Sequence, residues 1–395
     1  MAALSAATVV LAGCANLGGG FHAGFRGAVQ VLLVSVFSGP SATTGAYLQN
    51  SLQVEIDGLN AAGGLGGYRL DLLTADDAQQ PDRAVELVRE HLLDGGVRLV
   101  VGPSSSEAVT ATRPVVEQSH VPTCLPAPVA DDAVAGTTLT FRTTPSQRDR
   151  LTALLTYITA RTQIRRIGLI ASGDGDPDGV ARLLGQLAPA LGVEYQGEVS
   201  VATAADPAAA VREMASRDVQ GVVLAGDPSV AADAVQAAQA IGLRAGMQVF
   251  GLDELGTSAF LRRGGDAASG TVFVSPTRSY LVDAPDSDSG EAYRTFVAGV
   301  RGRYGSAAGG EIRGWPEAAD CVLQWASAVR AAGTLDGGRV ARAWERLRID
   351  RERSAQGVEE RFAPDRHEVL GADGLYVYQW AKQADRFRLL QLRGP

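Results

Sequence analysis

The chain has 395 residues, which is more than one hydrophobic core usually supports, so its length favours two domains. Apolar residues make up 46% of it and charged residues 20%, a composition that indicates folded domains and excludes extensive disorder. The formal net charge is −8 and the arginines are scattered, so we expect no nucleic-acid partner.

The first 14 residues predict a bacterial lipoprotein signal peptide. Residues 2–12 are small or apolar and lead into Leu11-Ala12-Gly13-Cys14, which resembles a lipobox whose cysteine receives the lipid. No Arg or Lys precedes the apolar run, so a plain apolar tail is the alternative. Residues 15–28 are rich in Gly and Ala and predict a flexible tether. We therefore expect an extracytoplasmic protein that touches the membrane only through a lipid on Cys14.

From Val29 onward, short β-rich runs alternate with amphipathic helices, the pattern of parallel sheets in α/β domains. Before Pro145 the periodicity predicts strands over 31–36, 70–73, 99–101 and 121–125, with helices over 48–59, 85–92 and 108–118. After Pro145 it predicts helices over 151–160, 180–191, 207–216 and 230–241, and strands over 167–170, 219–224 and 249–252. The remainder predicts a strand over 271–274, helices over 316–332 and 338–347, and a hairpin of 374–380 with 386–390.

Two cysteines, Cys124 and Cys321, remain in the chain after Cys14. Cys124 lies in a short apolar strand and Cys321 in a helix, where buried free thiols are the commoner outcome. Although an exported protein can oxidise its thiols, we expect these two to stay unpaired.

The order of the segments and several short motifs resemble type I periplasmic solute-binding proteins, specifically the leucine/isoleucine/valine-binding family of ABC importers. The motifs that carry the resemblance are Ser38-Gly39-Pro40, Asn60-Ala61-Ala62-Gly63-Gly64, Asp76-Asp77, Val101-Gly102-Pro103 with Ser104-Ser105-Ser106, and Arg142-Thr143-Thr144. The resemblance covers nearly all of residues 29–392.

This resemblance implies an α/β fold of two Rossmann-like lobes joined by three hinge crossings, near Thr144, Leu252 and Arg351. Lobe 1 would take residues 29–145 plus 253–350, and lobe 2 residues 146–252 plus 351–395. The implied function is capture of a small solute by hinge closure and delivery to the permease subunits of an ABC importer, by a monomer. A tethered sensing module of a membrane signalling receptor is the alternative.

The resemblance also implies the ligand site. Ser106 matches the family serine that binds the ligand's α-carboxylate at a helix N-terminus, and we favour this role over ordinary N-capping, which is the alternative for a serine there. Asp253 matches the family acid that pairs with the ligand's ammonium group. The other positions that match ligand-binding residues are Ser105, Glu107, Ala127, Val129, Thr44, Gln147, Asp178 and Asp227.

Several of these positions depart from the family pattern. Val129 replaces a hydroxyl residue, Gln147 replaces an acid, and Thr44, Asp178 and Asp227 replace aromatic residues. The cleft is therefore expected to be more polar than that of a branched-chain amino-acid binder, with a small polar ligand such as an amino acid, an amide or a related compound.

Other motifs do not indicate a cofactor or catalysis. Asp174-Gly175-Asp176-Pro177-Asp178-Gly179 copies half of a calcium loop, but Gly185 stands where the bidentate glutamate is required. The four histidines lack metal-ligand spacing, and neither a nucleophile elbow nor a phosphate loop is present. We expect no cofactor, no metal and no enzyme activity, with a cryptic hydrolase as a minor alternative.

Overall fold

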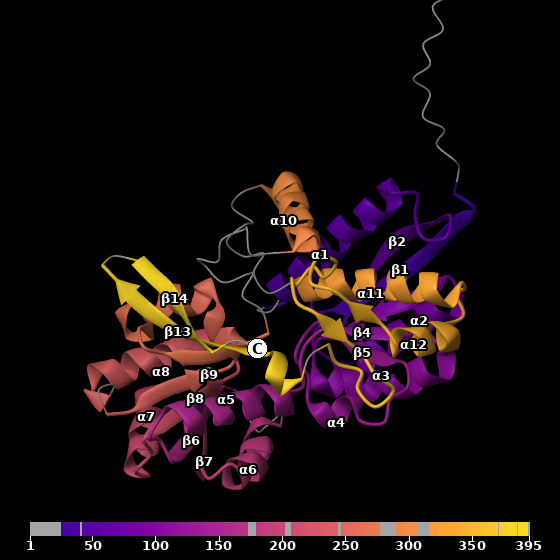
Figure 1. Ribbon diagram of the computed structural model, residues 1–395. Helices are drawn as coiled ribbons and strands as arrows, with labels where there is room; N and C mark the ends of the chain where they lie inside the picture. The colour runs from indigo at the N-terminus through magenta and orange to yellow at the C-terminus, as the bar shows by residue number, and fades with distance from the viewer. Residues whose placement is uncertain are drawn as a thin grey trace, which may run out of the picture.

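A computed structural model describes residues 25–39, 42–172, 179–201, 207–243, 246–276, 290–305, 316–369, 371–384 and 386–393. Its strands form two large sheets, each covered by helices on both faces, and these make two lobes (Figure 1). The predicted fold, two α/β lobes joined by three crossings, is confirmed. The lipobox with Cys14, the tether up to residue 24 and Asp178 lie outside the described residues.

Lobe 1 is built on a five-stranded sheet of order β2-β1-β3-β4-β5, parallel throughout. Its strands are β1 (Gly27–Ser35), β2 (Tyr68–Asp76), β3 (Val97–Val101), β4 (Thr123–Leu125) and β5 (Thr140–Arg142). The run Val31 to Val34 is fully buried because helices cover both faces of β1, which is why it is continuously apolar in the sequence.

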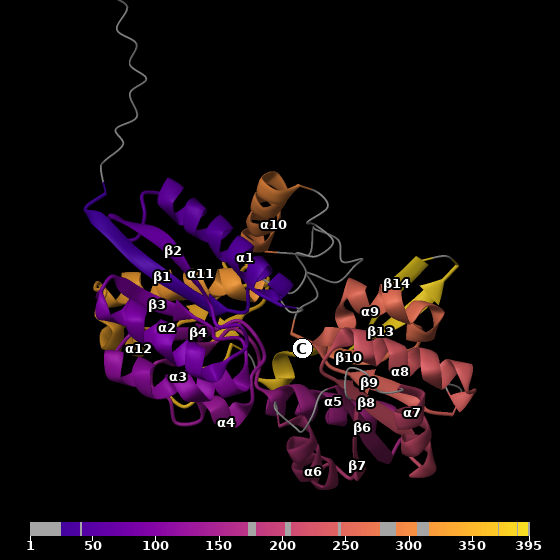
Figure 2. The same cartoon turned by 180° about the vertical axis from the view of Figure 1, so that it is seen from behind.

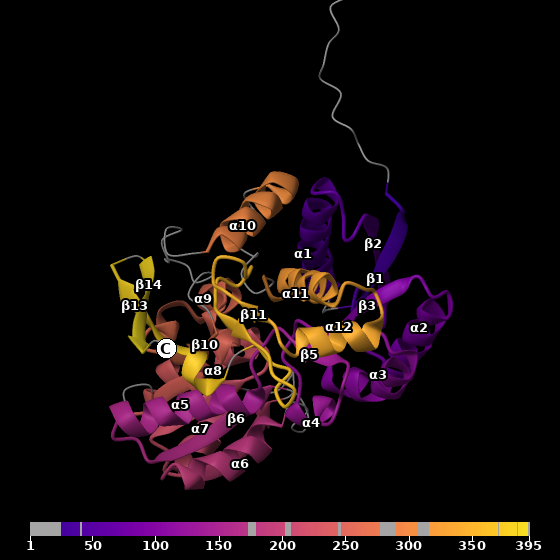
Figure 3. The ribbon, with the colours of Figure 1, turned by 45° about the vertical axis from the view of Figure 1, so that its right-hand side comes forward.

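The helices of lobe 1 cover the two faces of this sheet. They are α1 (Ala42–Ala61), α2 (Pro81–Leu93), α3 (Ser106–Ser119), the short α4 (Asp131–Val134), α10 (Glu291–Tyr304), α11 (Pro316–Ala332) and α12 (Gly337–Trp344). Helix α11 packs against α1 and α12, whereas α2 and α3 pack together as a separate pair (Figure 3). The predicted helical spacing of Leu48, Leu52, Ile56 and Leu59 is confirmed, since all four are buried.

Lobe 2 is built on a seven-stranded sheet of order β14-β13-β10-β9-β8-β6-β7. The strands are β6 (Arg166–Ser172), β7 (Glu194–Val201), β8 (Gly221–Ala225), β9 (Gln248–Gly251), β10 (Val272–Ser275), β13 (Tyr376–Gln383) and β14 (Arg386–Arg393). The C-terminal hairpin β13–β14 is antiparallel and adds to the edge of β10, at the far side of the lobe (Figure 2).

Two separate cores cover the faces of the second sheet. One contains α5 (Gln147–Arg161) and α6 (Val180–Ala190), and the other contains α7 (Pro207–Ser216), α8 (Pro228–Ala240) and α9 (Ser258–Gly264). The core of lobe 1 shares no residue with either of them. The two lobes therefore have independent cores, so the lobes can move relative to each other without disrupting either core.

Two of the expected lobe boundaries are corrected. Strand β10 pairs with β9 and β13, so residues 253–275 belong to lobe 2 and not to lobe 1. The segment with β11 (Arg348–Ile349) and β12 (Glu360–Arg361) packs on lobe 1, because Phe362 and Val369 are part of its core. The three crossings thus lie between β5 and α5, between β10 and α10, and between Val369 and the 3-10 turn Ala372–Gly374.

The expectation of unpaired thiols is wrong, because Cys124 and Cys321 form a disulfide inside lobe 1. Cys124 lies on β4 and Cys321 on α11, and the bond links positions 197 residues apart. Helix α11 returns to the first sheet late in the chain and contacts β4 there. Both cysteines are fully buried.

In the part of the chain that the structure describes, no helix combines the length and the apolar character that crossing a bilayer requires.

Candidate functional site

A cavity of about 470 Å³ lies between the two lobes. Lobe 1 contributes Thr44 at the start of α1, Ser104 after β3, and Ala127 and Pro128 after β4. Lobe 2 contributes Gln147, Arg150, Ala171, Ser172, Val180, Ala225, Gly226, Asp227, Leu252 and Glu254. The residues follow the carboxyl ends of parallel strands or begin helices, which is where ligands bind in open α/β sheets. The volume suits a small organic ligand.

Four of the predicted site residues meet in this cleft, namely Thr44, Ala127, Gln147 and Asp227. They come from four separate segments that the fold brings to one place. Asp178 and Cys14 lie outside the described residues.

The predicted carboxylate-binding serines occupy the N-terminus of α3. Ser105 is the N-cap residue, and its Oγ accepts the N–H of Ala108 at 3.2 Å. Ser106 is buried, and its Oγ accepts the N–H of Ala130 at 2.9 Å, so this hydroxyl ties α3 to the loop before α4. Of the serines in this loop, Ser104 lines the cavity and Ser106 does not. Glu107 is exposed on the first turn of α3.

Val129 belongs to a small apolar cluster with Val109, Leu125 and Ala133. Its side chain is buried there, which explains why an apolar residue stands at the position where the resemblance implies a hydroxyl. It contributes to lobe 1 packing and does not line the cavity.

Arg150 is a charged residue of the cleft that sequence reasoning missed. It lies one turn into α5, and its side chain is only 3% exposed. Its Nη1 donates to Oε1 of Gln147 at 2.7 Å, and its Nη2 donates to Oε2 of Glu254 at 3.1 Å. The same Nη2 forms an ion pair with Oδ1 of Asp253. Asp253, the predicted ammonium ligand, therefore already holds a cation that the protein supplies.

The loop after β8 places Asp227 at the cleft. Asp227 caps α8, because its Oδ1 accepts the N–H of Ser229 at 2.7 Å and the hydroxyl of the same residue at 2.6 Å. Its own N–H donates to Oγ of Ser172 at 2.5 Å. Gly226 has a φ of +97°, and a Cβ there would lie 2.1 Å from Ser172 Oγ, so only glycine fits this turn.

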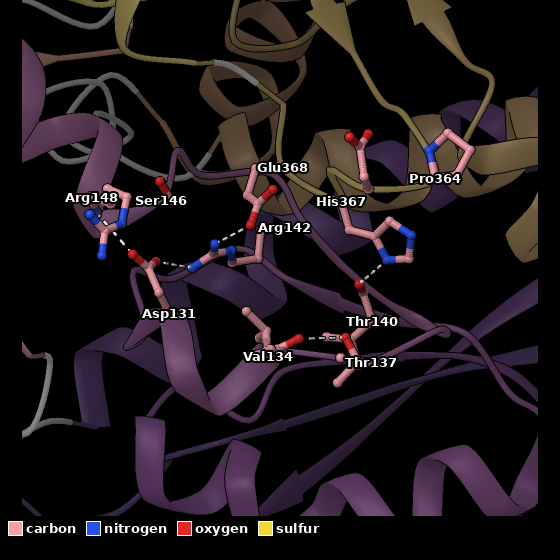
Figure 4. Close-up of a pocket in the computed structure, with 13 residues that line it drawn as sticks. Asp131, Val134, Thr137, Thr140, Arg142, Ser146, Arg148, Pro364, His367 and Glu368 are labelled. Carbon is pink, nitrogen blue, oxygen red and sulfur yellow. Dashed lines mark hydrogen bonds and ion pairs between the residues drawn. The ribbon is translucent and has the colours of Figure 1, made fainter.

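A second cavity, of about 400 Å³, lies beside the first crossing (Figure 4). Arg142, at the end of β5, is buried between two acids: its Nη1 lies 2.9 Å from Oδ1 of Asp131, and its Nη2 pairs with Glu368. The Asp131 carboxylate also accepts the backbone N–H groups of Gln147 and Arg148, each at 3.0 Å. These contacts join α4, β5, the start of α5 and the segment before the third crossing, so the cavity belongs to the hinge.

His367 forms another wall of the hinge cavity (Figure 4). Its Nδ1 donates to the carbonyl of Thr140 at 2.9 Å, and its ring stacks on Phe141 with ring centres 4.4 Å apart. The backbone N–H of Arg142 donates to the His367 carbonyl at 2.8 Å. The first crossing and the segment before the third crossing are thus hydrogen-bonded side by side.

A cluster of buried acids lies between α11 and the segment 354–360. Oδ1 of Asp320 accepts the N–H of Ala355 at 2.6 Å, and Oδ2 accepts the hydroxyl of Ser354 at 3.1 Å. Glu360 accepts the amide of Gln324 at 2.8 Å, and burial raises the pKa of Glu360 well above its ordinary value. The acids link α11 to the segment 354–360.

Glu317 stands at the first turn of α11 and is 4% exposed. Among the described residues, its Oε2 has no hydrogen-bond partner. Burial raises the pKa of Glu317 to about 8, with Asp320 adding to the shift and the Arg150 guanidinium opposing it. Glu317 is therefore mostly protonated at neutral pH. This lobe 1 acid also lies close enough to Arg150 of lobe 2 for the two groups to interact electrostatically.

Comparisons with known proteins identify a matching family and similar sequences. Residues 28–385 match the family model described as "Periplasmic binding protein". The Leu/Ile/Val-binding protein BraC3 of Rhizobium johnstonii is 26% identical over 262 residues, which cover 66% of this chain and 70% of that relative. The Leu/Ile/Val/Thr-binding protein of Salmonella typhimurium is 29% identical over 174 residues, which cover 44% of this chain and 47% of the relative.

Solved structures share the fold at low sequence identity. The branched-chain amino acid transporter substrate-binding protein LivJ of Streptococcus pneumoniae, in complex with isoleucine, has a TM-score of 0.74 and 18% identity, and the match covers 92% of this chain and 99% of that chain. A solute-binding protein of R. palustris in complex with 4-hydroxybenzoate has a TM-score of 0.77 and 15% identity, and the match covers 93% and 96% of the two chains.

Proposed function

Because the chain belongs to the type I periplasmic binding protein family, in its Leu/Ile/Val-binding branch, we propose that it is the extracytoplasmic solute-binding lipoprotein of an ABC importer. It captures a small polar ligand, an amino acid, an amide or a related compound, between its lobes. It then presents the closed form to the permease subunits in the membrane. The protein acts as a monomer.

The position of the 470 Å³ cavity supports this function. Residues of both lobes line it, and each lobe has a core of its own, so closing the lobes changes the cavity without disturbing either core. The polar groups Thr44, Ser104, Gln147 and Ser172 converge on the cavity and offer hydrogen bonds to a polar ligand.

The family consists of solute-binding proteins and not of enzymes, and its members work with ABC transporter permeases. We propose binding without turnover for this chain too. In the cleft, the described acids are already held by Arg150, by Ser229 and by backbone N–H groups, which suits a binding surface better than general acid–base chemistry.

A lipid on Cys14 would keep the protein at the outer face of the cytoplasmic membrane, next to the permease. The support for this anchor is the Leu11-Ala12-Gly13-Cys14 motif.

A thermal-shift screen of the purified chain tests the function. Amino acids, amides, urea, polyamines and organic acids are added one at a time, and a ligand that binds only the native state raises the melting temperature by mass action. At a concentration 100 times the dissociation constant the stabilisation is about 2.7 kcal/mol, which such a screen detects easily. The proposal predicts saturable stabilisation by one chemical class, whereas a flat response across all classes contradicts it.

A further inference from the structure

Four fully buried polar residues connect α11 to the segment 354–360, which precedes the third crossing. Asp320 and Gln324 lie one turn apart on α11, and Ser354 and Glu360 lie on the segment. The Ser354 hydroxyl lies 3.1 Å from Oδ2 of Asp320 and 3.1 Å from Oε1 of Glu360, so it bridges the two carboxyl groups. The two acids are therefore joined through one side chain that is shielded from water.

This bridge needs one more hydrogen than two ionised carboxylates allow. A serine hydroxyl carries a single hydrogen, so it can donate to one acid, and the other acid completes the bridge only if it carries a proton. Asp320 accepts the backbone N–H groups of Ala355 at 2.6 Å and Gln356 at 2.9 Å. Burial raises the pKa of both acids, but these N–H groups oppose the rise for Asp320. The proton therefore belongs to Glu360, which donates to Ser354, while Ser354 donates to Asp320.

Unpaired oxygen atoms beside the bridge indicate the same shortage of hydrogen. Among the described residues, Oε1 of Gln324 and Oε2 of Glu317 have no hydrogen-bond partner, although both side chains are more than nine-tenths buried. Gln324 donates its amide to Glu360 at 2.8 Å, and Glu317 stands one turn before Asp320 on α11. A buried group with more acceptors than donors favours proton binding, because a protonated carboxyl group supplies a missing donor.

The charged groups that face Asp320 also favour proton binding. Glu317 on the same helix and Glu55 on α1 both interact with it electrostatically. Burial raises the pKa of Glu317 to about 8 and that of Glu55 to about 7. The arginines that act on these two acids oppose the rise without cancelling it, Arg150 of α5 for Glu317 and Arg330 of α11 for Glu55. Acids are therefore concentrated around the bridge, and a bound proton reduces their repulsion.

The bridge also reaches the first crossing between the lobes. The side-chain amide of Gln356 donates to the Thr143 carbonyl at 2.9 Å and to Oε1 of Glu360 at 3.3 Å. Thr143 directly follows β5, and its own N–H donates to the carbonyl of Leu125, the last residue of β4, at 3.2 Å. Because an amide nitrogen carries two hydrogens, the Gln356 side chain holds the first crossing and Glu360 together.

We propose that one proton, shared by Glu360, Ser354 and Asp320, locks the segment 354–360 to α11 and to the first crossing, and that release of this proton as the pH rises unlocks the hinge. After release, two adjacent carboxylates repel each other, and Ser354 can donate to only one of them. Glu360 leaves the bridge, and Gln356 loses the contact that aligns it with Thr143. Since the crossings bend when the lobes close, ligand capture becomes pH-dependent, a consequence that rests on the function proposed above.

Amide hydrogen exchange of the ligand-free full chain, measured at several pH values, tests this proposal. In the unlocked state Glu360 is solvated and recovers its ordinary pKa of 4.5, whereas burial raises its pKa well above this value in the locked state. Between these two values unlocking releases one proton, so the protection factors at residues 354–360 and at Thr143 should fall about ten-fold for each pH unit. Amides of α7, which lies in the separate core of lobe 2, are the internal reference and should not follow this dependence.

Glu360→Gln isolates the effect of the proton. The amide can donate to Ser354 as the protonated acid does but cannot release a proton, so the protection factors should stay high and lose their dependence on pH. Glu359→Gln is the matched control, because Glu359 is the adjacent acid, is exposed and pairs with Arg361 at 2.6 Å. It should keep the parent's dependence on pH.

Three results would contradict the proposal. If the protection factors of the parent change no more with pH at residues 354–360 than in α7, the lock does not exist, and this comparison holds even if Glu360→Gln does not fold. A dependence that persists unchanged in Glu360→Gln overturns the assignment of the proton to this acid. A dependence at 354–360 that is absent at Thr143 overturns the link to the first crossing. The thermal-shift screen tests solute binding separately, so failure of one proposal is distinguishable from failure of the other.

Discussion

Asp131 and Arg142 form an ion pair within lobe 1, beside the first crossing, with 2.9 Å between Oδ1 and Nη1. The same carboxylate accepts two backbone N–H groups at the start of α5, so one lobe 1 acid caps a lobe 2 helix. Asp131→Asn should therefore lower the free energy of unfolding by about 1 to 2 kcal/mol, because the amide nitrogen that replaces one carboxylate oxygen no longer accepts an N–H group and buried Arg142 loses a charged partner. Urea denaturation followed by circular dichroism measures it.

Asp132→Asn is the matched control for that experiment. Asp132 is the neighbouring residue, and it pairs with the exposed Arg182 at 3.0 Å, a contact of the kind that contributes roughly 0 to 1 kcal/mol. Equal losses in the two variants would contradict a special role for Asp131 at the hinge.

The disulfide between Cys124 and Cys321 should contribute strongly to the stability of lobe 1. It closes a loop of 197 residues, and cross-links that close long loops typically stabilise by about 3 to 5 kcal/mol. Reduction should lower the melting temperature of the protein. The double variant Cys124→Ala, Cys321→Ala should melt at a similarly lowered temperature and should not respond to reductant. If reductant does not change the melting temperature of the parent protein, the disulfide does not form.

Glu317 should make stability fall as the pH rises. Its ordinary pKa is 4.5 and burial raises the pKa to about 8, so between these values the native state holds a proton that the unfolded chain has released. The free energy of unfolding should therefore decrease from pH 5 to pH 8 by about 3 kcal/mol. Burial also raises the pKa of Glu55, to about 7, which adds to the same slope.

The variant Glu317→Gln isolates the contribution of Glu317 to the pH dependence of the free energy of unfolding. The neutral side chain should leave stability at pH 5 nearly unchanged and should increase it at pH 8, because no charge has to be buried there. Glu90→Gln, on the exposed face of α2, is the control and should keep the parent's slope. Identical pH profiles for the parent and Glu317→Gln would rule out the assigned role of this acid.

The sequence was sufficient to predict the buried strands and the amphipathic helices, because both are encoded in local periodicity. The predicted strand over 31–36 overlaps β1, which spans Gly27–Ser35, and the predicted helix over 316–332 is α11. Strand β7 was missed because its residues are polar and half-buried, as an edge strand allows. Strand β5 has only three residues and therefore gives no periodic signal.

The cleft could be predicted only in part, since its chemistry depends on contacts between distant segments. Arg150 and Asp253 are about 100 positions apart, and a helical arginine is ordinarily taken for a solvated side chain. One local signal was available: Arg150 follows Gln147 by three residues and so shares its face of α5. The cysteine pairing likewise depends on the return of α11 to β4, which no local pattern encodes.

Cys14→Ser should release the protein from the membrane. If the motif directs lipid to this cysteine, the parent chain sediments with membranes when expressed in a bacterium that processes lipoproteins, and the variant appears in the soluble extracytoplasmic fraction. Fractionation with an antibody against the folded body measures both. Equal retention of the two proteins in the membrane fraction would mean that Cys14 is not the anchor.

Small-angle X-ray scattering tests whether ligand binding closes the two lobes. The compound that stabilises the protein best is added at saturation, and the scattering of the same sample is recorded with and without it. Because a ligand that contacts both walls of the cleft favours the closed arrangement, the radius of gyration should fall. A radius of gyration that is the same in both samples, with binding confirmed by calorimetry, would contradict the hinge mechanism.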